Sequence, residues 1–303
     1  MDITLTELHE AQQKALKQFI ETITTRVATA YLFCFALQQR QSAHTHCFAP
    51  PTRSLWFQAD LLLIYRDEET RRANEIQDQA NSHSNAQYQY ITVAMPYGEA
   101  MPLLEAGDPF INQVFSKGTL LYSHGVALPK RWGYVCHKTW LQSMRREWRR
   151  WFNTGCQFMD CAAYCLMDSN FGLAVFMVHQ TIEQACKAVI KVLLHIGSNT
   201  HNLAWMLKLC SSVIPEIGTL FPRNSPDEKA LFNLLKGSYI DCRYAAVFEV
   251  REEQAWVLYH RAGTLLRAIG DRCNQQIKAM ERYAGADYPA EYQQIYCEQS
   301  TGS

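Results

Sequence analysis

The sequence lacks any apolar run long enough to cross a membrane. No stretch approaches the roughly 20 apolar residues that span a bilayer, and the amino-terminal segment MDITLTELHE has no apolar signal region. We therefore expect a cytoplasmic protein that does not enter a membrane. The chain also has no internal repeat and no low-complexity tract, which argues against repeat arrays and long disordered segments.

An excess of charge of one sign is missing as well. The 29 basic residues balance the 29 acidic ones, which argues against a globally basic nucleic-acid coat protein but leaves room for a local basic patch. Hydrophobic residues make up 48% of the chain and charged residues 19%, so there is enough apolar side chain for hydrophobic cores. At roughly 100–200 residues per domain, 303 residues predict about two domains.

Cysteine pairs of the CxxC type are absent, although the chain has 11 cysteines. Cys156, Cys161 and Cys165 share one helical face, but a metal site would need a fourth ligand. The His-x-His-Cys run at residues 44–47 is also an incomplete ligand set, in a predicted surface loop. We predict no metal site, and we interpret most cysteines as reduced core residues. These are Cys156, Cys161, Cys165, Cys186, Cys210, Cys242 and Cys273.

The first 125 residues alternate predicted strands with predicted helices. Apolar runs indicate strands at 31–37, 55–65, 87–95 and 119–122. Helical spacing indicates helices at 5–26, with Thr4 or Thr6 as its cap, at 67–81, and from Asp108-Pro109 to Gly118. The polar residues 38–53, with Pro50-Pro51, predict a loop. Residues 1–125 should therefore form an α/β or α+β sandwich.

Residues 126–149 are expected to hold a linker and then a basic helix rich in tryptophan. Its cations are Lys138, Arg145, Arg146, Arg149 and Arg150, and its tryptophan stripe continues to position 151 as Trp140, Trp148 and Trp151. We interpret the stripe as packing between two domains while the arginines face water. The alternative is the basic rim of a nucleotide or RNA site.

Residues 150–285 predict an antiparallel helical bundle, followed by a polar tail at 286–303. The expected helices cover 153–167, 171–196, 201–213, 226–250 and 252–283. Asp168 or Ser169 should cap the second of these, and Asn199 or Thr200 the third. The mixed α+β class thus combines a sandwich with an all-α up-down bundle.

The helix that begins at Phe171 carries one polar stripe on an otherwise apolar rod. Gln180, Glu183 and Lys187 lie at spacings that put them on one face, and His179 borders that face. By itself this pattern indicates no more than a surface ion pair, which contributes a few tenths of a kcal/mol.

The first half resembles the nucleotidyltransferase fold of the polymerase-β type. In that family a Gly-Ser turn and an Asp-x-Asp pair hold a triphosphate and two Mg²⁺ ions. Here Asp60 matches one acid, but Gln58 stands in the position of its partner, and Gln38-Gln39 follows the first strand instead of Gly-Ser. The third strand, 91–95, carries no acid. The resemblance implies a degenerate domain without transferase activity.

Three segments of the second half match the HEPN domain in order and spacing. They are His179-Gln180 with Glu183 and Lys187, then Thr200-His201-Asn202-Leu203, then Tyr239, Asp241 and Arg243-Tyr244. The resemblance covers about 150–270 and is closest to the branch found in sacsin and bacterial proteins. It implies a helical bundle that commonly forms homodimers, associates with nucleotides and often accompanies a nucleotidyltransferase-type domain.

Many HEPN proteins are metal-independent RNases that use Arg-x4–6-His on a late helix. Here no histidine follows Arg243 until His260, so the acid/base group is missing. We therefore predict no catalytic residues and a non-catalytic nucleotide-binding or regulatory protein. The alternatives are an RNase or toxin that uses His201 or His260, or an interaction scaffold without a ligand.

The predicted ligand-binding residues all belong to the three matching segments. They are His179, Gln180, Glu183, Lys187, His201, Arg243 and Tyr244. A nucleotide or RNA would be the ligand, and we predict no other cofactor. We also expect the chain to form a homodimer through its helical domain. The same residues would otherwise brace the helices, with Arg243 paired to Asp241 or Glu183.

Overall fold

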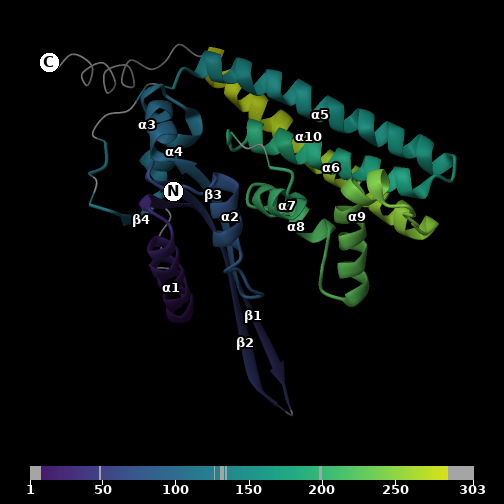
Figure 1. Ribbon diagram of the computed structural model, residues 1–303, viewed down its shortest axis with the longest axis horizontal. Helices are drawn as coiled ribbons and strands as arrows, with labels where there is room; N and C mark the ends of the chain where they lie inside the picture. Colours follow the sequence, from purple (N-terminus) through teal and green to yellow (C-terminus); the bar gives the residue numbers. More distant parts are fainter. Residues whose placement is uncertain are drawn as a thin grey trace. The chain divides into compact units, whose positions relative to one another are not determined.

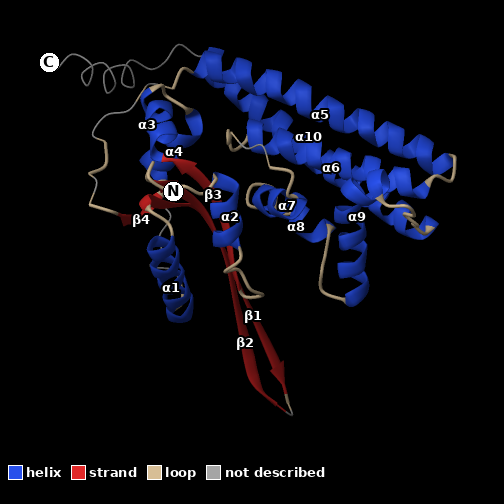
Figure 2. Cartoon of the chain, in the orientation of Figure 1, coloured by secondary structure: helices blue, strands red, loops and turns tan. Residues whose placement is uncertain are grey.

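The computed structural model describes residues 8–47, 49–125, 127–129, 133, 135–197 and 200–285. The chain divides into two compact units that meet between Val135 and Cys136. The first contains a four-stranded sheet with helices, and the described part of the second is helical (Figure 1, Figure 2). The mixed α+β class that the sequence predicted is confirmed.

The first unit combines four helices with four strands among its described residues. They are α1(Glu10–Arg26), β1(Thr29–His46), β2(Ala49–Tyr65), α2(Ala73–Asn81), β3(Tyr88–Pro96), α3(Tyr97–Glu105), α4(Pro109–Lys117) and β4(Thr119–Ser123). The strand order in the sheet is β3-β2-β1-β4. β1 is antiparallel to both β2 and β4, whereas β2 and β3 are parallel.

Helices cover both faces of this sheet. Alternation of side chains along each strand sends one set towards α1 and α2 and the other towards α4. On the first face Phe19 of α1 stacks on Tyr90 of β3, with ring centroids 4.0 Å apart. On the second face Phe33 of β1 contacts Phe115 of α4 at 4.7 Å. The central strands are therefore buried on both sides, as their continuous apolar runs require.

One prediction for the first unit was wrong. Residues 38–53 are not a loop, because β1 and β2 continue as a long antiparallel ribbon. The prolines 50–51 are tolerated since the pairing shifts register between His44 and His46. Residues 97–105 form α3, a helix that was not predicted. The predicted caps Thr4 and Thr6 lie outside the described residues, and His9 caps α1.

The second unit consists of longer helices. They are α5(His137–Met167), α6(Phe171–Val192), α7(Leu203–Ser211), α8(Ile217–Leu220), α9(Pro226–Tyr244) and α10(Glu252–Gly285). α6 packs against α5, α7, α9 and α10, and most of its side chains are buried. Its apolar composition follows from this central position, because a helix surrounded by others buries nearly its whole circumference.

Several boundaries differ from those predicted for the bundle. The helices expected at 138–151 and 153–167 are one continuous helix, α5. The helix from Pro226 ends at Tyr244 instead of Val250. The segment after it lies along the start of α6. There, a Cβ added to Gly172 would be 3.1 Å from the Phe248 carbonyl oxygen. Asn170 caps α6 and Asn202 caps α7, each one or two residues from the expected cap.

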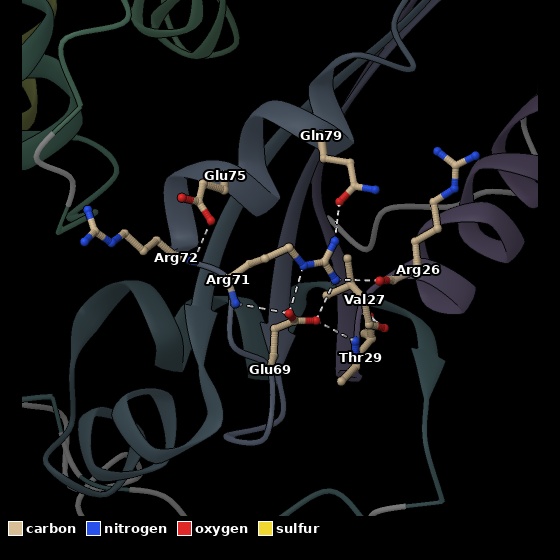
Figure 3. A network of polar contacts seen from close by, with 9 residues as sticks. Arg26, Val27, Thr29, Glu69, Arg71, Arg72, Glu75 and Gln79 are labelled. Atoms are coloured by element: carbon tan, nitrogen blue, oxygen red, sulfur yellow. Dashed lines mark hydrogen bonds and ion pairs between the residues drawn. The ribbon is translucent and has the colours of Figure 1, made fainter.

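A network centred on Glu69 and Arg71 joins three elements of the first unit (Figure 3). The Arg71 guanidinium donates to both oxygens of Glu69, at 2.8 and 2.7 Å, to Gln79 of α2 and to the Arg26 carbonyl at the end of α1. Glu69 also accepts from the Ala28 amide. The Arg71 side chain is the main reason that the pKa of Glu69 falls to about 2.

This lowered pKa predicts that the network stabilises the fold only at moderate and high pH. As the pH falls, Glu69 takes up a proton in the unfolded chain at a higher pH than in the folded chain. The contribution of the network to stability is therefore complete above about pH 5 and disappears as the pH falls towards 2. In denaturant titrations, Glu69→Gln should reduce the free energy of unfolding most at pH 7 and least near pH 2. Glu68→Gln, which removes a carboxylate that is 64% exposed, should change little at either pH. A Glu69→Gln effect that does not depend on pH would contradict the prediction.

Candidate functional site

The Glu183 carboxylate is the centre of a polar cluster in the second unit. Its side chain is 2% exposed, and its Oε1 accepts from Lys187 Nζ at 2.7 Å and from His201 Nδ1 at 3.0 Å. Lys187 lies one helical turn further along α6, whereas His201 comes from the segment before α7. The second oxygen, Oε2, is buried without a hydrogen-bond partner among the described residues. Through this one oxygen, Oε1, the carboxylate therefore joins α6 to the segment before α7.

His179, one turn before Glu183, is held in its neutral form. Burial lowers the pKa of its ring to about 4, although the Glu183 carboxylate acts in the opposite direction. The Gln180 side-chain nitrogen lies 3.3 Å from His179 Nδ1, which suits an amide donating to a neutral ring. At pH 7 this residue therefore contributes a polar ring and no charge.

Tyr239 of α9 connects the remaining members of the cluster. Its ring centroid lies 5.4 Å from that of His179 and 6.0 Å from that of His201. The Arg243 guanidinium carbon lies 4.1 Å from the same ring, and Arg243 Nε donates to the Tyr239 carbonyl at 2.7 Å. This cation–π contact follows from the helical spacing of four residues. Arg243 is held in place by an aromatic ring instead of a carboxylate.

Trp151 of α5 forms the other side of the cluster. Lys187 Nζ lies 5.1 Å from its ring centroid, and its indole nitrogen donates to Glu147 at 2.8 Å. Lys187, which is 12% exposed, thus has a carboxylate and an aromatic face as partners.

The cluster has a buried interior and an exposed margin. Glu183 and His179 are each 2% exposed, whereas His201 is 59% and Tyr244 75% exposed. Arg243 is exposed too, and its guanidinium lies 5.1 Å from the Tyr244 ring. A ligand would therefore meet His201, Arg243 and Tyr244 first, and the buried carboxylate would act on it through Lys187 and His201.

The structure brings the seven predicted ligand residues into one region of the second unit. One prediction about them was wrong, because Arg243 forms an ion pair with neither Asp241 nor Glu183 and packs on Tyr239 instead. Two participants were missed. Tyr239 could have been found from its place in the matching segment, four residues before Arg243. No signal in the sequence connects Trp151 with Lys187.

The other candidate sites are less complete. In the first unit Asp60 and Gln58 are both buried, and the Gln58 amide donates to Asp60 at 2.9 Å. Asp60 pairs in register with Ile91, so β3 supplies no second acid beside it. Among the described residues no group of His, Cys, Asp and Glu could hold a metal ion. The side chains of His44 and His46 lie outside the described part of the chain.

The cysteines divide into buried and exposed ones. Cys186, Cys210 and Cys273 are buried, as predicted, but Cys161 is exposed and Cys156, Cys165 and Cys242 are only partly buried. Cys161 lies on the exposed face of α5, whereas Ala162 and Leu166 in the same turns are buried.

The tryptophans of α5 contact partners within the second unit. Trp140 donates to the His195 ring at 3.0 Å, and Trp148 stacks on Phe152 with centroids 4.0 Å apart. Burial lowers the pKa of His195 to about 4, so Trp140 meets a neutral ring. Arg145 forms an ion pair with Glu281 of α10. These contacts give the basic helix a structural role inside the bundle.

None of the described helices combines the length and the apolar character that a membrane span needs.

Comparison with known proteins finds similarity to one family and to two solved structures. Residues 148–272 match the HEPN domain family. A crystal structure of an archaeal HEPN homologue is similar, with 17% identity, 42% of this chain and 97% of that chain covered, and a TM-score of 0.30. A nucleotidyltransferase-like protein from Exiguobacterium sibiricum is also similar, with 11% identity and a TM-score of 0.27. The match covers 92% of this chain and 82% of that chain. No curated protein sequence matches the chain.

The buried charge of Glu183 leads to a prediction about stability. Glu183→Gln should leave Lys187 without its counter-charge and reduce the free energy of unfolding by about 3 kcal/mol in denaturant titrations. The double variant Glu183→Gln with Lys187→Met should regain most of that loss, because it removes both charges together. If the two substitutions proved additive, the ion pair would not be the interaction that holds this part of the bundle.

Proposed function

Because residues 148–272 form a HEPN domain, we propose that the chain is a nucleotide-binding protein whose ligand places its phosphate at the polar cluster of α6, α7 and α9. The observation that supports this most is the position of Arg243. It is exposed, it is oriented by Tyr239, and no carboxylate of the described residues pairs with it. Its Nε donates to the Tyr239 carbonyl, and its Nη groups, which have no partner among the described residues, suit a phosphate.

The charge of the cluster favours the same class of ligand. The Glu183 carboxylate already has Lys187 and His201 as partners, and Arg243 adds a further cation at the exposed margin. An anion would complete the balance, and a nucleotide phosphate offers several oxygens for the arginine and the imidazole.

An aromatic surface beside the cations would receive the base. Tyr244 is 75% exposed and lies next to Arg243. Burying one face of such a ring against a nucleobase would remove apolar surface from water and add stacking. This arrangement favours a nucleotide over inorganic phosphate.

We further propose that the helical unit forms a homodimer. Large apolar side chains are exposed near the ends of α5 and α9 and just after α9. They are Tyr164, Met167, Ile240 and Val247, each at least 59% exposed. Exposed apolar residues gathered on neighbouring helix ends suit a self-complementary interface, and the molar mass from light scattering tests this.

A second candidate function is RNA cleavage with His201 as acid and base. His201 and Arg243 both pack against the Tyr239 ring, so an exposed histidine and an arginine occupy one region despite the missing histidine after Arg243. These are the residue types that metal-independent cleavage requires. No described contact joins His260 to them, since its ring partners are Trp256 and Tyr259 on α10.

The nucleotide proposal is tested by thermal unfolding in the presence of nucleoside mono-, di- and triphosphates. At least one should raise the melting temperature of the wild-type protein, because a ligand that binds only the folded state stabilises it. Arg243→Gln and His201→Ala change exposed side chains and should each weaken the response about tenfold in ligand concentration. Arg272→Gln removes an exposed cation of α10 and should respond as the wild type does.

Two outcomes would reject this assignment. Absence of a shift with every nucleotide would exclude nucleotide binding, and an equal loss in Arg272→Gln would show that overall charge, not the cluster, is responsible. RNA hydrolysis in the presence of a chelator, lost in His201→Ala and kept in Arg272→Gln, would support the second candidate instead.

A further inference from the structure

The ribbon of β1 and β2 continues well past its neighbours in the sheet. β4 pairs with β1 only from Tyr31 to Cys34, and β3 pairs with β2 only from Phe57 onwards. From the Arg40–Trp56 pair to the tip, the two strands pair only with each other (Figure 2). We call residues 40–46 and 49–56 the β arm. At about 3.4 Å per residue the arm is roughly 24 Å long.

A two-stranded ribbon of this kind has little stability of its own. Isolated hairpins are marginal in water, and an arm without neighbouring strands leaves both edges with unpaired backbone groups. The pairs Ser42–Ser54 and His44–Thr52 bring polar residues together along it. The arm therefore lacks the apolar composition of a ribbon that packs on another sheet.

The arm is cationic in a chain whose total charge is balanced. No aspartate or glutamate occurs anywhere from Thr22 to Ala59, whereas the arm contains Arg40 and Arg53 and two histidines. The remaining sequence supplies all the acids that cancel the charge of the chain as a whole. A polyanion approaching the arm would meet no repelling carboxylate along its length.

Arg40 is exposed and oriented. It is the register partner of Trp56, and its guanidinium carbon lies 5.1 Å from the Trp56 ring centroid. No carboxylate of the described residues pairs with it. Arg71 in the same unit differs, because its N–H groups already bond Glu69, Gln79 and the Arg26 carbonyl. A guanidinium that stacks on a ring keeps its edge free for phosphate oxygens.

We propose that the β arm binds double-stranded nucleic acid by lying in a groove, with Arg40 contacting a phosphate. The major groove of B-DNA is about 12 Å wide and admits a two-stranded ribbon. Arginine, hydroxyl and backbone N–H groups all make phosphate contacts in such complexes, and the sequence of the arm contains arginine, serine and threonine. A single strand would need free aromatic faces, but Arg40 already lies over one face of Trp56.

This binding site is independent of the polar cluster. The arm belongs to the first unit and the cluster to the second, so nucleotide binding at the cluster and duplex binding at the arm can succeed or fail separately.

The test measures fluorescence anisotropy of labelled 20-base-pair DNA and RNA duplexes with the full chain, from 50 to 200 mM salt. The wild-type protein should bind at least one duplex. Arg40→Gln should reduce the slope of log affinity against log salt by about 1. At 0.1 M salt the affinity should fall by roughly tenfold.

The matched control is Lys14→Gln, which removes one exposed cation from α1 in the same unit. It should keep the wild-type slope. A second variant, in which a short Asn-Gly turn replaces residues 41–55, should lose duplex binding while the nucleotide response of the cluster persists.

Several results would overturn the proposal. They are the absence of duplex binding by the wild-type protein at 50 mM salt, equal losses in Arg40→Gln and Lys14→Gln, unchanged binding by the shortened arm, and tighter binding of a single strand than of either duplex.

Discussion

Placing the Glu183 carboxylate inside the helical unit is the constraint on which the rest of the site depends. A buried charge needs partners, and one oxygen bonds both Lys187 and His201. Those partners determine where the segment before α7 meets α6. Tyr239 then packs against the two histidines and orients Arg243. A single acidic residue thus organises side chains from α6, from α9 and from the segment before α7, while Arg243 remains exposed.

The two units use arginine in opposite ways. The N–H groups of Arg71 hold the fold together, because they donate hydrogen bonds to Glu69, to α2 and to the end of α1. Arg243 and Arg40 are held by aromatic rings and keep their edges available. The difference follows from chemistry, because a carboxylate occupies the N–H groups of a guanidinium whereas a ring occupies only its face. The arginines held by rings are therefore the better candidates for binding anions.

Much of the fold could be predicted because its signals are local. Apolar runs located the central strands, and Asp108-Pro109 located the start of α4. The β arm was missed because its polar sequence and two prolines resemble a loop. Only the pairing of one strand with the other makes residues 38–53 extended, and that pairing is not visible within either strand.

The sequence by itself determined which residues share the polar stripe of α6, since helical spacing places His179, Glu183 and Lys187 within two turns. It also determined the mixed class and the HEPN-type segments. Only the tertiary structure decided that Arg243 meets Tyr239 instead of an acid, that Trp151 lies against Lys187, and that Cys161 is exposed. These outcomes depend on how separate helices pack against one another. Spacing along one helix carries no information about which face another helix will cover.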